Sequence, residues 1–454
     1  MVTAPAFRHD APGTPAQRWW HHPDRGRVAE LDLVDADGGR LRHVVVVAAH
    51  PDDETMGAGG LLAQLAVMPE DVRPRLSVVL LTDGEASHPA SPTHAPSALA
   101  EVRLAECREA LDRLGAEIAL VRRGLPDGEV AAAEDRCVAD LCRLVGDGRG
   151  VLLLAPWRRD GHPDHEAAGR AAAAAAARTG ARLLEYPVWF WHWGRPDDAP
   201  WSTMRRVSLP PDALAAKDRA IASHRSQVRG LSVQEGDEPL LGPDLLAHFL
   251  CPQELFVEEP GVDAALDRLH RERPEPWGAP TRWYEERKRQ LVLAMLPDRE
   301  HGRALDIGCS TGVLTEALAD RCSHVLAVDS SPAAVRTARA RLEGLAHVDV
   351  ELRALPREWP PGRFDLVVVS EVGYFLSPRD LERLVVEVDA CLADDGVVVL
   401  CHWRHPVAGW LLDGGDVHAA FEAGVGWPRL AAYRDDDVEI LLLGPSSRMP
   451  EPTS

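Results

Sequence analysis

Short apolar runs rich in β-branched residues alternate with helical stretches along the first half of the chain. Residues 43–49 read HVVVVAA, and an uninterrupted run of this kind is typical of a central parallel strand covered on both faces. Further strands are predicted at 75–82, 116–121, 151–155 and 182–190, and helices at 59–67, 98–115, 130–145 and 166–179. Because strands and helices alternate, the pattern predicts a parallel sheet with helices on both faces.

A second β–α series follows a stretch between residues 260 and 280 in which prolines and glycines surround a charged segment. Its strands are predicted at 303–307, 324–328, 348–352, 364–369 and 397–401, with an antiparallel pair at 430–434 and 438–443. The sequence therefore predicts an α/β protein with two Rossmann-like domains. The predicted parts are an N-terminal arm (1–40), a first domain (41–259), a linker (260–284), a second domain (285–445) and a tail (446–454).

Composition narrows the class of protein. Hydrophobic residues make up 45% and charged residues 27% of the chain, as in ordinary globular proteins. The net charge of −21 argues against nucleic acid or an anionic membrane as the main partner. The eight cysteines form no C-x-x-C pair, and no apolar run reaches the roughly 18 residues of a membrane span, so we expect a cytoplasmic protein with free thiols. The 50 basic residues include only two lysines, Lys217 and Lys288, which we attribute to coding bias.

Two polar motifs follow predicted strands of the first domain. Residues 50–54 (HPDDE) follow the first strand, and residues 162–165 (HPDH) follow the fourth and open a helix. Open α/β sheets place ligand sites at the carboxyl ends of strands, so both motifs can face one crevice. Two imidazoles and a carboxylate that leave one position open are the donor set of catalytic zinc. Zinc acidifies water, while a spare carboxylate and imidazole can move protons or stabilise an oxyanion. The alternative is exposed turn carboxylates and core histidines.

These motifs, AHPDDE (49–54) and GHPDH (161–165), resemble those of the PIG-L/LmbE family of zinc-dependent N-deacetylases. Further stretches are similar to that family: TDGE (82–85), RLAE (103–106), GLPDG (124–128), EYPVW (185–189) and SHRSQ (223–227). The resemblance implies three metal ligands, His50, Asp53 and His165. It also implies Asp52 as general base, His162 as oxyanion stabiliser or acid, and Asp164 as the residue that orients His162. Substrates of the family are N-acetylated amino sugars and related amides.

Other aromatic and histidine side chains of the first half have weaker signals. Trp189, Trp191, His192 and Trp193 are expected to pack in the core, although aromatic rings also suit the apolar face of a sugar. We expect His224 to be structural.

The second domain opens with a strand, a glycine-rich turn and a helix. The turn follows ALDIGCSTG (304–312), and Asp329 ends the next strand about twenty residues further on. Glycine lets the backbone approach a ligand closely, and a carboxylate in this place can accept hydrogen bonds from ribose hydroxyls. The turn lacks G-x-G-x-x-G, but the pattern indicates a site for a nucleotide cofactor.

This half resembles class I S-adenosylmethionine-dependent methyltransferases. Residues 364–376 (FDLVVVSEVGYFL) are similar to the NodS type, which N-methylates a de-acetylated amino sugar. The resemblance implies that Asp306, Gly308 and Gly312 line the methionine end of the cofactor. It further implies that Asp329 holds the ribose and that Ala354 and Leu355 flank the adenine. An acid common in that loop is absent, because Arg353 precedes Ala354.

The methyl acceptor is expected beyond the fourth and fifth strands of this domain. An ammonium acceptor must lose a proton before methyl transfer, so a nearby carboxylate or imidazole is useful. The candidate catalytic residues are Glu371, His402 and His405. Packing or helix capping is the alternative for the two histidines, and His418 is expected to be structural.

The sequence as a whole predicts a bifunctional enzyme that uses Zn²⁺ and S-adenosylmethionine. It would remove an N-acetyl group from an amino sugar or glycosylated metabolite and then N-methylate the freed amine. One alternative is a deacetylase joined to an O-methyltransferase that acts on a different atom. The other is a second domain that serves only as a binding or regulatory module. The expected partner is a small-molecule substrate, and homo-oligomer formation stays open.

Overall fold

The computed structural model describes residues 12–115 and 117–445. These residues form two compact units that divide after Val262, with residues 178–180 grouped with the second unit. The start of the predicted arm (1–11), Ala116 and the predicted tail (446–454) lie outside the described residues. Within the described ranges, no helix combines the length and apolar character that a membrane crossing requires.

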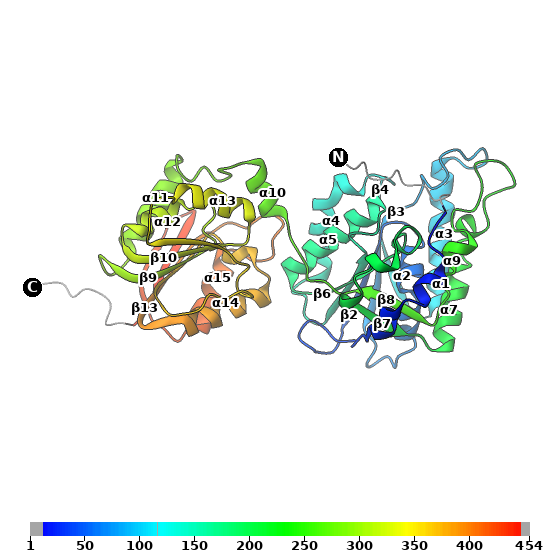
Figure 1. Ribbon diagram of the computed structural model, residues 1–454, viewed down its shortest axis with the longest axis horizontal. Helices are drawn as coiled ribbons and strands as arrows, with labels where there is room; N and C mark the ends of the chain where they lie inside the picture. Colours follow the sequence, from blue (N-terminus) through cyan, green and yellow to red (C-terminus); the bar gives the residue numbers. More distant parts are fainter. Residues whose placement is uncertain (1–11, 116, 446–454) are drawn as a thin grey trace, which may run out of the picture. The chain divides into compact units, whose positions relative to one another are not determined.

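The first unit is built on one mixed sheet, shown in Figure 1. Among the described residues its strands follow the order β1-β7-β8-β6-β5-β2-β3-β4. Five of them are parallel, as predicted: β2 (His43–Ala48), β3 (Arg75–Thr82), β4 (Ile118–Leu125), β5 (Val151–Pro156) and β6 (Arg182–Tyr186). Three further strands lie at one edge: β1 (Ala29–Glu30), β7 (Met204–Ser208) and β8 (Gln253–Val257). The sequence predicts a parallel sheet, and β8, a strand that the prediction does not include, runs antiparallel to β6 and β7, so the sheet is mixed.

Helices cover both faces of this sheet. The side chains of β2 alternate: Val44 and Val46 pack with α2 (Asp53–Ala66), α3 (Pro96–Leu114) and α7 (Pro211–Ile221). Val45 and Val47 pack on the other face with α4 (Glu134–Val145) and α5 (Pro163–Thr179). Shorter helices complete the unit: α1 (Ala16–Trp20), α6 (Phe190–Trp193), α8 (Arg225–Val228) and α9 (Pro243–Leu246).

The order of the strands creates a switch point beside β2. From β2 the chain adds β3 and then β4 on one side, and it then crosses to place β5 on the other side of β2. Ligands bind in open sheets at such points, outside the carboxyl ends of the strands. The ends of β2 and β5 carry the two polar motifs, so the topology places both at this crevice.

The second unit contains a seven-stranded sheet within the described residues, in the order β11-β10-β9-β12-β13-β15-β14. The parallel strands are β9 (His301–Ile307), β10 (Cys322–Asp329), β11 (Val348–Leu352), β12 (Phe364–Ser370) and β13 (Leu392–Trp403). The predicted antiparallel pair is confirmed as β14 (Arg429–Arg434) and β15 (Val438–Leu443). The α/β fold with two Rossmann-like units is therefore confirmed.

Helices again cover both faces of the second sheet (Figure 1). On one face lie α11 (Trp283–Met295), α12 (Val313–Ala319) and α13 (Pro332–Arg341), and on the other lie α14 (Pro378–Cys391) and α15 (Gly414–Gly424). Residues of the predicted linker form α10 (Ala265–Glu272). This helix packs on the second unit, where the Asp267 carboxylate accepts a hydrogen bond from the Ser331 hydroxyl at 2.7 Å.

Candidate functional sites

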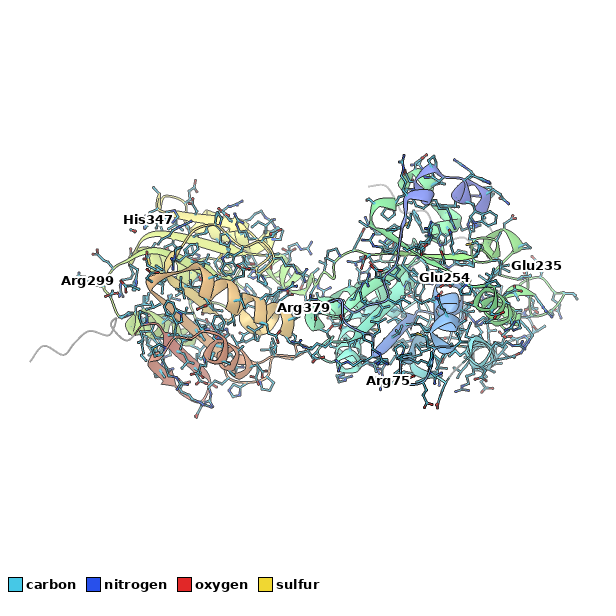
Figure 2. All side chains as sticks on the ribbon, turned by 90° about the horizontal axis from the view of Figure 1, so that it is seen from below. Arg75, Glu235, Glu254, Arg299, His347 and Arg379 are labelled. Atoms are coloured by element: carbon cyan, nitrogen blue, oxygen red, sulfur yellow. The ribbon has the colours of Figure 1, made fainter. Side chains whose placement is uncertain are left out.

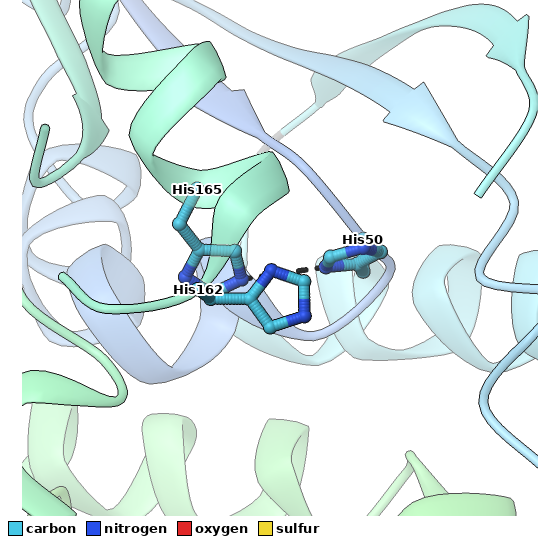
Figure 3. Close-up of side chains that lie close together, drawn as sticks. All are labelled: His50, His162 and His165. Atoms are coloured by element: carbon cyan, nitrogen blue, oxygen red, sulfur yellow. Dashed lines mark hydrogen bonds between the residues drawn. The ribbon is translucent and has the colours of Figure 1, made fainter. Parts of the chain in front are cut away.

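The two polar motifs of the first unit meet at the ends of β2 and β5. The Nδ1 atom of His50 lies 3.3 Å from Nε2 of His165. The same His165 atom lies 3.1 Å from Oδ1 of Asp53, and His50 Nδ1 lies 3.7 Å from Oδ2 of Asp53. The His162 ring centroid is 4.9 Å from that of His50 and 4.6 Å from that of His165 (Figure 3). The three residues proposed as ligands are thus neighbours, and donor atoms of His50, His162 and His165 all lie within 4.8 Å of one another.

Local backbone conformation directs these side chains. Helix α2 begins at Asp53, five residues after the last residue of β2 and earlier than predicted. Asp52, just before it, has φ of 122°, a conformation that non-glycine residues adopt mainly at functional sites. Because glycine has a low helix propensity, the glycines of α2 prevented the prediction of its first turns from the sequence. Packing requires one of them, since a Cβ on Gly57 would lie 2.0 Å from the Tyr186 ring.

Asp160 supports the imidazole of His165, and sequence reasoning missed it. Its Oδ2 lies 2.7 Å from His165 Nδ1, the ring nitrogen that faces away from Asp53. The carboxylate of Asp160 also accepts backbone N–H bonds from residues 188, 189 and 190. Histidine ligands usually donate their second N–H to a carboxylate of this kind. The available signal was an aspartate two residues before His162.

Asp127, also missed, faces the other nitrogen of His50. Its Oδ1 lies 3.0 Å from His50 Nε2, and Asp164 Oδ2 lies 3.3 Å from the same atom. Asp164 further accepts backbone N–H bonds from Gly128 and Val130. Its carboxylate therefore contacts His50, whereas its backbone N–H reaches Nδ1 of His162 at 3.2 Å. These donor atoms form a second close set, His50, Asp127 and Asp164.

Burial and charge shift the pKa values of this centre in opposite directions. Burial alone would lower the pKa of His50, but hydrogen bonds to Asp127 and Asp164 outweigh it and raise that pKa to about 9. For His165, burial is again outweighed, here first by the Asp53 charge and then by Asp160, and its pKa rises to about 10. Burial and the two neighbouring histidines lower the pKa of His162 well below its usual range, so this imidazole stays neutral.

Asp52 is nearly enclosed and is held by Arg103 of the RLAE stretch. The Arg103 guanidinium donates to Oδ2 of Asp52 at 3.0 Å and to the carbonyl oxygens of Pro51 and Gly84. Burial raises the pKa of Asp52 to about 7 against the opposing Arg103 charge. A carboxylate with a pKa near neutrality suits proton transfer.

The aromatic residues near this centre mostly pack. Trp189 and Trp191 are buried in the core of the first unit, and Trp189 stacks on Trp193 with ring centroids 4.9 Å apart. Trp189 and Trp191 therefore pack in the core, as expected from the sequence. His224 is also buried, with Nε2 3.3 Å from the Thr55 hydroxyl, which agrees with a structural role.

A buried ion pair forms hydrogen bonds with the backbone of helix α2. Lys217 of α7 and Glu254 of β8 are 1% and 4% exposed, with Nζ and Oε1 2.7 Å apart. Figure 2 labels Glu254. The ammonium also donates to the carbonyl of Met56, while Glu254 accepts the backbone N–H groups of Gly60 and Leu61. Side chains from two other elements thus bond directly to peptide groups of the helix that carries Asp53. We call this arrangement the α2 clamp.

In the second unit the predicted cofactor residues gather around one turn. Gly308 and Gly312 have φ of 72° and 80°, which the turn requires, and Gly312 precedes α12. The Asp329 carboxylate at the end of β10 accepts N–H bonds from Ser310 and Ser331. Asp306 is buried and accepts a hydrogen bond from Thr315 at 2.6 Å.

The predicted adenine loop follows β11 beside the ribose acid. The backbone N–H of Arg353 donates to the carbonyl of Asp329 at 3.0 Å, which holds the loop at this strand end. Ala354 donates its N–H to Glu358 at 2.8 Å, and Leu355 packs against the core. Glu358 is an acid that sequence reasoning did not connect with this loop.

The three acceptor-side candidates lie in different surroundings. Glu371 follows β12 beside the glycine turn, where a Cβ on Gly308 would touch Val372 at 2.6 Å. His402 is fully buried, with Nδ1 3.1 Å from Nε2 of His418. His405 is exposed and lies 2.9 Å from Asp437. Only Glu371 of the three is both next to the turn and partly open to solvent.

The buried histidine pair predicts a dependence of stability on pH. Burial lowers the pKa of His418 to about 4 and that of His402 well below its usual range. As the pH drops, these histidines therefore bind protons in the unfolded chain before they do so in the folded chain. The free energy of unfolding should fall between about pH 6.5 and about pH 4, by about 3 kcal/mol for His418. Urea unfolding at several pH values should show a smaller loss in His418→Gln. His405→Gln, which removes an exposed imidazole, should keep the wild-type slope.

Comparison with known proteins agrees with both sites. Residues 45–176 match the PIG-L family, described as GlcNAc-PI de-N-acetylase, and residues 304–396 match a methyltransferase domain family. The chain thus carries a PIG-L deacetylase domain followed by a methyltransferase domain.

The second domain is similar to nodulation protein S. Identity is 33% over 119 residues with the protein of Bradyrhizobium diazoefficiens and 32% over 135 residues with that of Sinorhizobium fredii. These matches cover 26% and 29% of this chain, and the chain spans 54% and 62% of the two relatives. A solved structure described as N-methyltransferase NodS from Bradyrhizobium japonicum WM9 in complex with S-adenosyl-L-homocysteine is 21% identical, with a TM-score of 0.38. That match covers 40% of this chain and 99% of the other.

Proposed function

We propose that this chain is a bifunctional enzyme of small-molecule metabolism. The first unit would hydrolyse the N-acetyl amide of an amino sugar or glycosylated metabolite with zinc. The second would N-methylate the amine uncovered by the first, with S-adenosylmethionine as donor. The observation that carries the proposal is the close approach of His50, Asp53 and His165 beside the enclosed Asp52.

The residues of the first site fit a zinc ion. Zinc prefers imidazole nitrogen and carboxylate oxygen in a compact set, which His50, Asp53 and His165 offer. Further carboxylates, Asp127 and Asp160, lie against the two imidazoles and give the centre an excess of negative charge suited to a divalent cation. When bound, zinc would act as a Lewis acid on an amide carbonyl and would acidify water.

The surrounding residues would handle the protons. Asp52, oriented by Arg103, would accept a proton from the attacking water. The neutral imidazole of His162 would donate a hydrogen bond to the developing oxyanion. When the C–N bond breaks, the nitrogen takes the proton that Asp52 accepted from water, so the products are an amine and acetate.

The second unit would hold the cofactor along its glycine turn. Gly308 and Gly312 let the backbone approach the methionine end, and Asp329 at the end of β10 can accept hydrogen bonds from ribose hydroxyls. The cofactor supplies the methyl group. The acceptor amine must be uncharged when it attacks, and Glu371 is the carboxylate among the candidates, directly before Val372, which lies against Gly308.

Product analysis tests the two-step proposal. Purified protein is incubated with an N-acetylglucosamine glycoside and methyl-labelled S-adenosylmethionine, and products are located by tandem mass spectrometry. We expect an amine first and then a methylamine at the same nitrogen. A methyl group on oxygen, with the amine untouched, would refute the shared nitrogen.

Removing one ligand tests the metal assignment. His165→Ala deletes an imidazole that is fully buried between Asp53 and Asp160, so we expect zinc to be lost from the purified protein. Elemental analysis measures the metal, and circular dichroism checks the fold. Full zinc occupancy in this variant contradicts the assignment. His21→Ala, at an exposed histidine of the same unit, serves as the control.

A further inference from the structure

The hydroxyl of Tyr284 on α11 is buried and has no hydrogen-bond partner among the described residues. Leaving a buried hydroxyl unpaired costs about 1–3 kcal/mol, so native structures usually satisfy such groups. The unsatisfied hydroxyl therefore indicates a place where a ligand supplies a polar atom.

Charged and aromatic groups surround this hydroxyl. Lys288, one turn further along α11, has Nζ 2.8 Å from Glu285, 2.9 Å from Glu371 and 5.2 Å from the Tyr284 ring centroid. The Tyr284 ring meets that of Trp403 edge-on at 5.7 Å. We define the Lys288 cluster as Tyr284, Glu285, Lys288, Glu371, Tyr374 and Trp403.

Glu371 is fixed at the centre of the cluster. Its carboxylate accepts hydrogen bonds from Lys288, from the Tyr374 hydroxyl and from the backbone N–H of Trp403. Its φ of 56° is a left-handed conformation that costs energy for a non-glycine residue and recurs at functional sites. The side chain nevertheless keeps 23% of its surface exposed, so a ligand can reach it.

The sheet places this cluster on the acceptor side of the cofactor turn. Glu371 directly follows β12 and Trp403 ends β13, whereas Asp329 ends β10, on the opposite side of β9. Neighbouring strands lie about 4.8 Å apart, so the cluster borders the Gly308 turn from the side away from the ribose acid. A methyl acceptor would approach from there.

The charge of the cluster favours a cation. Two carboxylates face one ammonium, which leaves one net negative charge beside the rings of Tyr284 and Trp403. Burial would lower the pKa of Lys288, but Glu371 and Glu285 outweigh it, so the lysine stays charged. Carboxylates and aromatic faces both attract an ammonium group.

We propose that Tyr284 contacts the methyl-acceptor nitrogen and that Lys288 is a positioning residue that holds Glu371 for the same contact. The Tyr284 hydroxyl accepts a hydrogen bond from the acceptor ammonium, and Glu371 supplies the opposite charge. Because the contact needs an ammonium, the site selects an amine over its N-acetylated form. The inference rests on the proposed N-methyltransferase function.

Titration calorimetry on the full chain saturated with S-adenosylhomocysteine tests the contact, with glucosamine and N-acetylglucosamine as probes. We expect glucosamine to bind more tightly than N-acetylglucosamine, and Tyr284→Phe to weaken it by about tenfold or more. The affinity for S-adenosylhomocysteine should not change. The matched control is Tyr433→Phe, whose hydroxyl already has Arg287 and Asp435 as partners.

Positioning by Lys288 has its own readout. Lys288→Met should weaken glucosamine with the affinity for S-adenosylhomocysteine unchanged, and Lys288→Arg should restore part of the loss. Unchanged glucosamine affinity in Tyr284→Phe, or weaker S-adenosylhomocysteine binding instead, overturns the inference, as does wild-type protein that binds the cofactor product but not glucosamine. If wild-type protein fails to bind S-adenosylhomocysteine, the proposed function itself fails.

Discussion

Asp52→Asn is expected to lower deacetylation by about 10²–10⁴-fold, the usual contribution of a general base. The amide keeps the shape of the side chain but cannot accept the proton of the attacking water. Because Asp52 bonds to Arg103 and is not one of the three proposed ligands, zinc content should stay at the wild-type level. The acetate released and the zinc bound are measured on the same preparation.

The control for this substitution is Asp212→Asn, at an exposed aspartate in the first turn of α7. It should leave both acetate release and zinc content unchanged. Wild-type turnover in Asp52→Asn would contradict the assignment of the base. Loss of zinc in that variant would instead make Asp52 a ligand.

Lys217→Met is expected to lower the free energy of unfolding by about 3–5 kcal/mol, because it leaves Glu254 buried without its cation. The α2 clamp bonds to the helix that begins at Asp53, so zinc affinity should fall as well. Urea denaturation measures the first effect and zinc titration of the apoprotein the second.

A surface pair gives the comparison for the α2 clamp. Glu109 and Arg113 lie at i and i+4 on α3 with side chains 34% and 44% exposed, so Arg113→Met should cost less than about 1 kcal/mol. If Lys217→Met and Arg113→Met lower the free energy of unfolding equally, the buried pair stabilises the fold no more than the surface pair does.

Central strands and the meeting of the two motifs were predictable from sequence. A run such as residues 43–48 fits only a strand covered on both faces, and polar residues directly after it must lie at the strand end. Parallel strands end at one edge, so His50 and His165 were expected to share a crevice, and their 3.3 Å separation agrees.

Elements whose stability comes from tertiary contacts were not predictable. Helix α2 was expected to begin at residue 59, because the glycines of its first turns have low helix propensity. Strand β7 has two arginines in five residues and gains its place by pairing with β8. Asp160 and Glu254 follow no motif, and only the folded chain shows what they bond.

Histidine spacing was a poor guide to the acceptor side. His402 lies near the end of β13 and His405 two residues beyond it, yet the first packs in the core beside His418 and the second faces Asp437 at the surface. Successive side chains of a strand point to opposite faces of the sheet, but the sequence does not show which residues they contact on each face. The two lysines, whose scarcity we attributed to coding bias, are both buried in pairs with glutamates.

That enclosure has a practical consequence. One lysine lies in each unit, 1% exposed at position 217 and 9% at position 288. A lysine-specific protease should therefore spare the native chain and cut only molecules in which a unit has opened. The rate of cleavage after residue 217 would report how often the first unit opens, and the rate of cleavage after residue 288 how often the second does. Both rates can be measured in a single digestion.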